Sequence, residues 1–269
     1  MNLMEWRNRR LPILRSEAFQ QSSLPVTILI YHFWPDLEAN ERFSETEFSI
    51  LQTWHCCGYL PVSIVCDKPC SALLAFAHKH PHVTIWTSPS LIPGSVESMS
   101  YDCNGRMSEY FQTEYVLVIQ NDGFPLQKGL EAFLGTHNYW GAPLTRKKQW
   151  LAVDKLVRCT VGNGGFSLRT RELCLEANRH WKKWEHRINN YYWKRDDIFY
   201  CLTLRLLSWR YFRLASLPSY QEAFRFSYDK LIDIPPPNKL PFGFHGAPSF
   251  KILSEQFLEQ SIEGLNRAF

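Results

Sequence analysis

The sequence lacks the patterns that would indicate a zinc ribbon or a membrane-spanning segment. Its eight cysteines form no C-x-x-C pair and have no regular spacing, which argues against a zinc ribbon. No apolar run approaches the roughly 20 residues needed to cross a bilayer, and the charges near the N-terminus lie too close to its short apolar pieces for a secretory signal. We therefore expect a cytosolic protein with free, mostly buried thiols, the alternative for the cysteines being a metal or disulfide role.

The two common glycine-rich phosphate loops are also missing. Segment 161–169, VGNGGFSLR, contains no Gly-Lys-Ser/Thr and does not have the G-x-G-x-x-G spacing, so it is neither a P-loop nor a dinucleotide fingerprint. Charge of one sign is scarce, because 30 basic and 26 acidic residues give a net charge of +4. That balance mildly favours an anionic ligand and is too weak to indicate a nucleic-acid partner.

What the sequence does contain is a regular α/β pattern. Its 269 residues are 45% hydrophobic and 15% aromatic, enough to bury a full-sized core. From Pro25 onward, short aliphatic runs alternate with amphipathic stretches, which is typical of a largely parallel sheet covered by helices. Ser44, with Glu47 three residues later, predicts a capped helix start. The predicted strands are 26–33, 62–67, 82–87 and 115–120, and the helices between them are 44–59, 71–80 and 98–113.

The second half differs in texture, with more glycine, proline and aromatic residues. We predict helices at 170–187, 196–209 and 250–264, an edge strand or loop at 219–229, and a proline-rich loop at 234–246. Residues 1–24 are interpreted as a partly ordered basic leader, and their arginines offer an alternative, contact with an anionic membrane surface. Residues 25–269 form one domain, with a nucleotide-binding half at about 25–126 and an acceptor and catalytic half at about 127–269.

Several acidic residues and one histidine follow predicted strands. The aliphatic run 116–119 stops at Gln120, Asn121 and Asp122, and Gly123 then indicates a turn. A carboxylate at such a strand tip can bind a divalent cation, and the alternative is that Asp122 forms an Asx turn. Asp67 and His32 follow two other strands, and ligands gather at this edge of parallel sheets.

Three further motifs carry chemical groups. Gly164 and Gly165 permit close backbone approach to a ligand, or form a simple tight turn. Asp196 and Asp197 open a helix, where they either cap its N-terminus or accept a proton from a hydroxyl nucleophile. His245, between two glycines, is either a structural residue or a ligand.

Taken in this order, these motifs resemble the GT-A glycosyltransferases. The closer resemblance is to a bacterial family of glycosyltransferase-like domains that shares Q-x-D, W/G-A-P, GNGGFSLR, the acidic pair and FG-x-H over roughly residues 25–246. It implies a mixed, largely parallel GT-A (Rossmann-like) sheet flanked by helices. It also implies transfer of a sugar, typically a hexose, from a nucleotide-diphosphate sugar to a hydroxyl of a glycan or lipid-linked glycan, as in polysaccharide biosynthesis.

The same resemblance implies roles for single residues. Segment 120–122, QND, resembles the D-x-D metal motif, with Gln120 in place of its first acid, so Asp122 and His245 would hold Mn²⁺ or Mg²⁺. Asp197 matches the catalytic base of inverting enzymes, and Asp196 matches the neighbouring acid.

The resemblance and the strand ends together give the expected binding residues. Those expected to bind the donor are Tyr31, His32, Asp67, Arg106, Gln120, Asn121, Gly164 and Gly165. Those expected to stack on the acceptor are Trp140, Tyr192 and Trp193, for which core packing is the alternative. Three other activities stay open: a retaining GT-A enzyme, a non-catalytic nucleotide- or carbohydrate-binding protein, and a nucleotidyltransferase, which would normally need two carboxylates for its metal ions.

Overall fold

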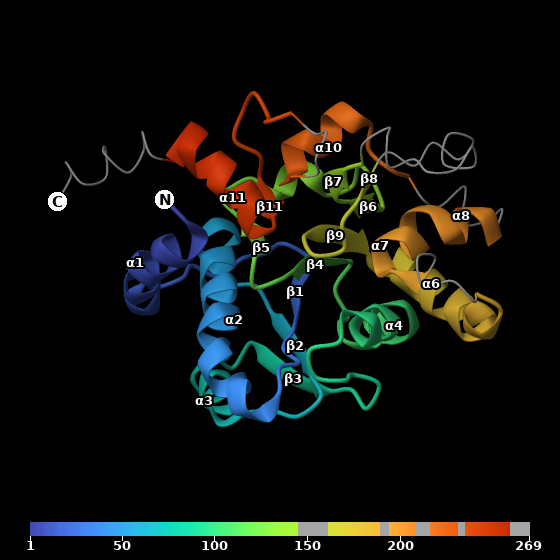
Figure 1. Ribbon diagram of the computed structural model, residues 1–269, viewed down its shortest axis with the longest axis horizontal. Coiled ribbons are helices and arrows are strands. Elements are labelled where there is room, and N and C mark those ends of the chain that lie inside the picture. Colours follow the sequence, from blue (N-terminus) through green and yellow to red (C-terminus); the bar gives the residue numbers. More distant parts are fainter. Residues whose placement is uncertain (145–160, 189–193, 208–215, 231–234, 259–269) are drawn as a thin grey trace.

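The computed structural model describes residues 1–144, 161–188, 194–207, 216–230 and 235–258. Its centre is a six-stranded sheet in the order β3-β2-β1-β4-β9-β6 (Figure 1). The first four strands in this order are parallel, and β9 and β6 run antiparallel to their neighbours. The strand bounds are β1 Val26–Tyr31, β2 Val62–Cys66, β3 Val83–Thr87, β4 Tyr115–Ile119, β6 Tyr139–Trp140 and β9 Ser167–Thr170. The predicted mixed, largely parallel α/β sheet is confirmed.

Helices cover both faces of this sheet. On one side lie α1, α2 and α3, and on the other lie α4 and α6 (Figure 1). Successive side chains along a strand point to opposite faces of the sheet, so each strand contributes to the core on both sides. Ile28 belongs to the apolar cluster under α1, α2 and α3, and Leu29 belongs to the cluster under α4 and α6. Strands buried on both faces read as continuous aliphatic runs, which is why they were visible in the sequence. The helix bounds are α1 Leu3–Ser16, α2 Asp36–Cys57, α3 Ser71–Lys79, α4 Val96–Arg106 and α6 Arg171–Trp184.

The N-terminal segment is an ordered helix, which corrects the expectation of a partly ordered leader. Helix α1 begins at a capping box formed by Asn2 and Glu5. Trp6 is 6% exposed and stacks on Phe124 with ring centroids 6.0 Å apart. The helix is ordered because its apolar side chains complete the core, although the sequence around them is strongly basic.

Three other elements differ from their predicted bounds. Helix α2 begins at Asp36, and the Ser44 hydroxyl donates to the carbonyl of Glu41 inside the helix, so Ser44 is not its cap. Helix α4 ends at Arg106 and continues as the 3-10 turn Met107–Glu109. Segment 219–229 forms helix α10, Tyr220–Phe226, and then strand β10, where an edge strand or loop was expected.

The second half of the chain adds a small sheet beside the central one. Its strand order is β10-β11-β5, with β10 Ser227–Asp229 parallel to β11 Gly243–His245, and β11 antiparallel to β5 Gly123–Pro125. The register aligns Asp229 with His245 and His245 with Gly123. Residues that are far apart in the sequence therefore meet at the turn that follows β4.

The remaining elements all lie beyond residue 129. Their bounds are η2 Leu130–Phe133, β7 Ala142–Pro143, β8 Val161–Gly162, η3 Glu185–Arg187, α7 Asp196–Ile198, the π-helical turn Phe199–Thr203, α8 Leu204–Leu207, α11 Ala247–Leu253 and the π-helical turn Ser254–Leu258. Seven cysteines are described, all with free thiols and six of them buried, as expected; Cys159 lies outside the described residues. None of the helices in the described ranges is long and apolar enough to span a bilayer.

Candidate functional site

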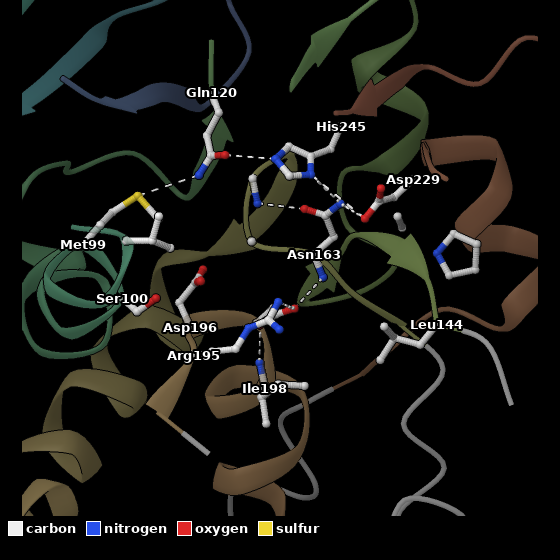
Figure 2. Close-up of a pocket in the computed structure, with 16 residues that line it drawn as sticks. Met99, Ser100, Gln120, Leu144, Asn163, Arg195, Asp196, Ile198, Asp229 and His245 are labelled. Carbon is white, nitrogen blue, oxygen red and sulfur yellow. Dashed lines mark hydrogen bonds and ion pairs between the residues drawn. The ribbon is translucent and has the colours of Figure 1, made fainter. Parts of the chain in front are cut away.

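A cavity of about 350 Å³ lies at the carboxyl end of β4, between α4, α7 and the small sheet (Figure 2). It has two kinds of wall. The polar wall consists of Ser100, Gln120, Asn163, Arg195, Asp196, Asp197, Asp229 and His245, with the backbone of Gly164 and Gly165. The apolar wall consists of Val96, Met99, Ala142, Pro143, Leu144 and Ile198.

Asp196 is fixed from below by a buried arginine. The Nη2 of Arg169, which is fully buried, donates to Asp196 Oδ2 at 2.6 Å. The guanidinium also lies 4.4 Å from the ring centre of Tyr200, and its Nε donates to the hydroxyl of Ser167. A Cβ at Gly164 would come within 2.0 Å of Asp196 Oδ2. Gly164 is therefore required here because the carboxylate occupies the space of a side chain.

Asp197 has a different environment from its neighbour. It is 4% exposed, its Oδ1 accepts the Ile198 N–H at 2.9 Å, and its Oδ2 accepts the Asn163 N–H at 3.1 Å. Burial and the nearby charge of Asp196 raise the pKa of Asp197, although Arg195 and the two backbone N–H groups oppose the rise. A buried carboxyl group with a raised pKa at a cavity wall is suited to accept a proton.

His245 faces the cavity from β11. Its Nε2 lies 2.9 Å from Gln120 Oε1 and 3.6 Å from Asp122 Oδ1. Gln120 is held in this orientation because its Nε2 donates to the sulfur of Met99. Burial would lower the pKa of His245, but the nearby negative charges of Asp229, whose Oδ2 lies 4.0 Å from Nδ1, and of Asp122 outweigh it, so the pKa is raised.

Four residues of the polar wall were missed by the sequence reasoning: Ser100, Asn163, Arg195 and Asp229. Asn163 Nδ2 donates to Asp229 Oδ2 at 2.8 Å and lies 3.0 Å from His245 Nδ1. The sequence held a signal for Asn163, because asparagine between glycines is typical of a left-handed turn with a specific side-chain role. For Asp229 there was none, since its position depends on the pairing of β10 with β11.

The residues near His245 fit a divalent cation only if the amide of Gln120 takes part. Within the described ranges, no group of three or more His, Cys, Asp or Glu side chains is arranged to hold a metal ion. Asp122 and Gln120 both place an oxygen near His245 Nε2, at 3.6 and 2.9 Å. One carboxylate, one imidazole and one amide oxygen suit Mn²⁺ or Mg²⁺ when phosphate oxygens and water fill the other positions.

Two predicted donor residues lie outside the cavity. Tyr31 is 6% exposed and its hydroxyl donates to Asp102 Oδ2 at 3.0 Å, so its ring is not free to stack on a base. His32 is 1% exposed and its ring nitrogens contact Thr46 and the carbonyl of Ala39. Both side chains therefore point into the interior at the end of β1.

Arg106, Asn121, Asp67 and Trp140 do not line the cavity either. Arg106 donates to Ser88 and Glu109, and Asn121 points toward α2, where its Oδ1 accepts from Thr46. Asp67 is half-buried at the end of β2. Trp140 is 4% exposed and its Nε1 donates to the carbonyl of Phe133, which corresponds to the core-packing alternative. Tyr192 and Trp193 lie outside the described residues.

A larger cleft, of about 610 Å³, lies near the other end of the small sheet. It is lined by aromatic and proline residues with Lys128, Arg225 and Lys239, and none of the described residues that line it is a carboxylate or a histidine. We take the smaller cavity as the candidate active site because its lining contains groups that can move protons or hold phosphate.

Similar folds occur among solved structures. The galactosyltransferase LgtC, with donor and acceptor sugar analogues, is 12% identical over 87% of this chain and 94% of its own, with a TM-score of 0.49. The mannosyltransferase Ktr4p from S. cerevisiae, in complex with GDP, is 9% identical over 75% of each chain, with a TM-score of 0.46. The mannosyltransferase PcManGT from Pyrobaculum calidifontis, with GDP-Man and Mn²⁺, is 11% identical over 80% of this chain and 61% of its own, with a TM-score of 0.39.

Sequence comparison gives one family. No curated protein matches the chain. The model of the family described as "Protein of unknown function (DUF5672)" matches residues 104–245, which is more than half of the chain and includes β4, the glycine-rich turn, the acidic pair and His245. The chain belongs to the DUF5672 family.

Proposed function

We propose that this protein is a glycosyltransferase that moves a sugar, of the hexose type, from a nucleotide-diphosphate sugar to a hydroxyl group. The observation that carries the proposal is the cavity wall where Asp197, Gly164, Gly165, Gln120 and His245 meet at the carboxyl edge of a parallel sheet. Ligands of open α/β sheets bind at this edge. The wall combines a buried carboxyl group of raised pKa with polar groups suited to a phosphate.

Asp197 is the better of the two acids for the role of base. Asp196 is committed to the guanidinium of Arg169 at 2.6 Å, so one of its oxygens is already engaged in a buried ion pair. Among the described residues Asp197 has no buried cation within ion-pair distance, and its partner Arg195 is half exposed and 3.5 Å away. We assign Asp196 a positioning role and Asp197 the catalytic one.

The donor would lie over the glycine-rich turn. The absence of side chains at Gly164 and Gly165 lets a sugar approach the backbone, with its diphosphate toward Gln120, Asp122 and His245. A Mn²⁺ or Mg²⁺ ion held by these three residues would supply positive charge to the leaving diphosphate. Five residues that were expected to bind the donor lie outside the cavity lining, and we propose only an indirect role for them, in supporting the strand ends beside the cavity. They are Tyr31, His32, Asp67, Arg106 and Asn121.

The reaction would be a single displacement. The acceptor oxygen bonds to the anomeric carbon as its proton passes to Asp197, while the bond from that carbon to the phosphate oxygen breaks and the nucleoside diphosphate leaves. Attack opposite the leaving group inverts the anomeric centre. Val96, Met99 and Leu144 form an apolar surface for the acceptor, which we propose to be a glycan or a lipid-linked glycan.

The proposed setting is the cytoplasm, with contact to a membrane surface. Helix α1 exposes the apolar side chains of Met4 and Ile13, by 65% and 64%, and the basic side chain of Arg9. Apolar and basic side chains on one exposed helix suit the boundary of an anionic membrane. Sedimentation with vesicles of anionic lipid, compared with neutral vesicles, would test this contact.

The test of the activity is a screen of nucleotide sugars with Mn²⁺ and with Mg²⁺, in which release of the nucleoside diphosphate is measured. Turnover of one donor supports the proposal, and the anomeric configuration of the product, read by NMR, separates inversion from retention. Binding of a nucleotide sugar with no turnover, with or without an acceptor mixture, would favour the non-catalytic binding protein.

A further inference from the structure

Asn163 has an unusual backbone conformation at the centre of the polar wall. Its φ of 69° makes it the only non-glycine residue with a positive φ in the described parts of the chain. Asparagine enters this left-handed region more readily than other residues, yet it is uncommon there. Such a conformation persists where surrounding contacts hold it, and in an active site it can belong to the mechanism.

The backbone of Asn163 holds one side of the cavity. Its N–H donates to Asp197 Oδ2 at 3.1 Å, and its carbonyl accepts the hydroxyl of the fully buried Tyr139 at 3.2 Å. The N–H bond favours the ionised form of Asp197 and lowers its pKa against the effect of burial. The left-handed turn therefore aims one backbone donor at the proposed base.

The side chain of Asn163 holds the other side. Its Oδ1 accepts the Gly165 N–H at 2.9 Å, so its Nδ2 is the end that faces Asp229 Oδ2 at 2.8 Å and His245 Nδ1 at 3.0 Å (Figure 2). An amide nitrogen can only donate, so Nδ1 of a neutral His245 must accept. In the cation-free protein the proton of that neutral ring is then on Nε2, which faces Gln120 Oε1 at 2.9 Å. A cation bound at Nε2 would require the ring proton on Nδ1, with Asp229 Oδ2, 4.0 Å away, as its acceptor.

We propose that Asn163 is a positioning residue that fixes Asp197 through its backbone and His245 through its side chain, with Asp229 anchoring the amide. The catalytic part of this inference rests on the proposed function. In that function Asp197 is the base and His245 binds the diphosphate, and Asn163 would hold the two side chains at a constant separation. Catalytic groups that act on the two ends of a reacting bond need a fixed separation, because a displacement of either group by about 1 Å can lower the rate by about 100-fold.

Two substitutions distinguish the role of the Asn163 backbone from the role of its side chain. Asn163→Gly removes the side chain but accepts a positive φ, so it retains the N–H bond to Asp197. Asn163→Ala removes the same side chain and disfavours the left-handed conformation, so it also weakens that bond. We expect both to lower kcat/KM by about 10–100-fold, the usual effect of removing a supporting hydrogen bond. Only Asn163→Ala should move the acid limb of the pH-rate profile, and it should move to higher pH.

A double substitution tests the link to Asp229. If Asp229 acts through the amide of Asn163, Asn163→Gly combined with Asp229→Ala loses little more activity than Asn163→Gly alone. Fully additive losses would overturn the proposal. So would wild-type kcat/KM in Asn163→Gly, or an equal shift of the acid limb in both Asn163 variants.

A measurement without turnover keeps this inference separate from the proposed function. NMR of the ¹⁵N-labelled histidine ring at alkaline pH, with divalent cations removed by EDTA, reports which nitrogen of His245 carries the proton. We expect the Nε2–H form in the wild type and a mixture of both forms in Asn163→Gly. An unchanged ring in a folded Asn163→Gly protein would overturn the inference, whereas a wild type that turns over no nucleotide sugar would overturn only the glycosyltransferase assignment.

Discussion

The guanidinium of Arg169 and the carboxylate of Asp196 form an ion pair, 2.6 Å apart, beneath the cavity, with the arginine side chain fully buried. Removing one partner of a buried pair leaves an uncompensated charge. We expect Arg169→Met to lower the free energy of unfolding by about 3–5 kcal/mol, measured by urea denaturation. Arg195→Met, at a side chain 51% exposed, is the matched control and should lose less than about 1 kcal/mol. Equal losses would mean that the pair is not the anchor of Asp196.

Gly164 is expected to tolerate no side chain. A Cβ there would lie 2.0 Å from Asp196 Oδ2, so Gly164→Ala must displace the carboxylate or the turn. We predict that turnover of a donor falls by at least about tenfold, or about 1.4 kcal/mol in the barrier. Gly105→Ala is a suitable control, because its Cβ would meet only the ring of Trp181, at 3.0 Å. Wild-type turnover in Gly164→Ala would contradict the tight packing described for this turn.

The four parallel strands of the central sheet were predictable from the sequence, but their order, and the strands β9 and β6, were not. Strands such as β1 and β4 are buried on both faces, so their sequences are uninterrupted aliphatic runs. The polar residues at their ends, including Gln120, followed directly. The structure of α1 was not predictable in this way, because its order depends on Trp6 packing on Phe124, more than a hundred residues away in the sequence.

The positions of several site residues could not be predicted from the sequence either. Tyr31 and His32 follow the pattern expected of ligand-binding residues at a strand end, yet Asp102 and Thr46 take their polar atoms into the interior. Asp229 enters the cavity through a strand pairing that no local motif specifies. Motifs identified the acidic pair, the glycine turn and His245, whereas the contacts among them needed the fold.

The pH dependence of turnover should report Asp197. Because burial and Asp196 raise its pKa, and the ionised form is the base, the rate should fall as pH decreases through a value above the ordinary aspartate range. Arg195 lowers this pKa, so Arg195→Ala should move the acid limb to still higher pH. Added salt should reduce the difference between the two enzymes, because Arg195 is half exposed. An acid limb unaffected by Arg195→Ala would exclude Asp197 as its source.

Gln120 gives a test of the cation. Gln120→Glu keeps the shape of the side chain and adds a second carboxylate beside His245, so the Mn²⁺ concentration for half-maximal activity should fall by about tenfold, or about 1.4 kcal/mol. Asp122→Asn should change it in the opposite direction by a similar factor. Chelation with EDTA should abolish turnover, and added Mn²⁺ should restore it. Full activity after chelation would show that the reaction does not require a divalent cation.

Arg7 links α1 to the turn that carries Asp122. Its Nη2 donates to the carbonyl of Asn121 at 2.6 Å, and the residue is 9% exposed. Arg7→Met should reduce the free energy of unfolding by about 1.5–3 kcal/mol, the range for a hydrogen bond to a charged group, and should raise KM for the donor. Arg9→Met, on the exposed side of the same helix, should change neither quantity measurably. Similar effects of both substitutions would indicate a general role of helix charge.

The most direct test of the account compares Asp197→Asn with the wild type, using whichever nucleotide sugar the wild type turns over. Calorimetry should give donor affinities within about threefold of each other, while kcat for transfer falls by about 10²–10⁴-fold, the usual contribution of a general base. Unchanged kcat with intact donor binding would contradict the assignment of Asp197 as the base and favour a retaining mechanism.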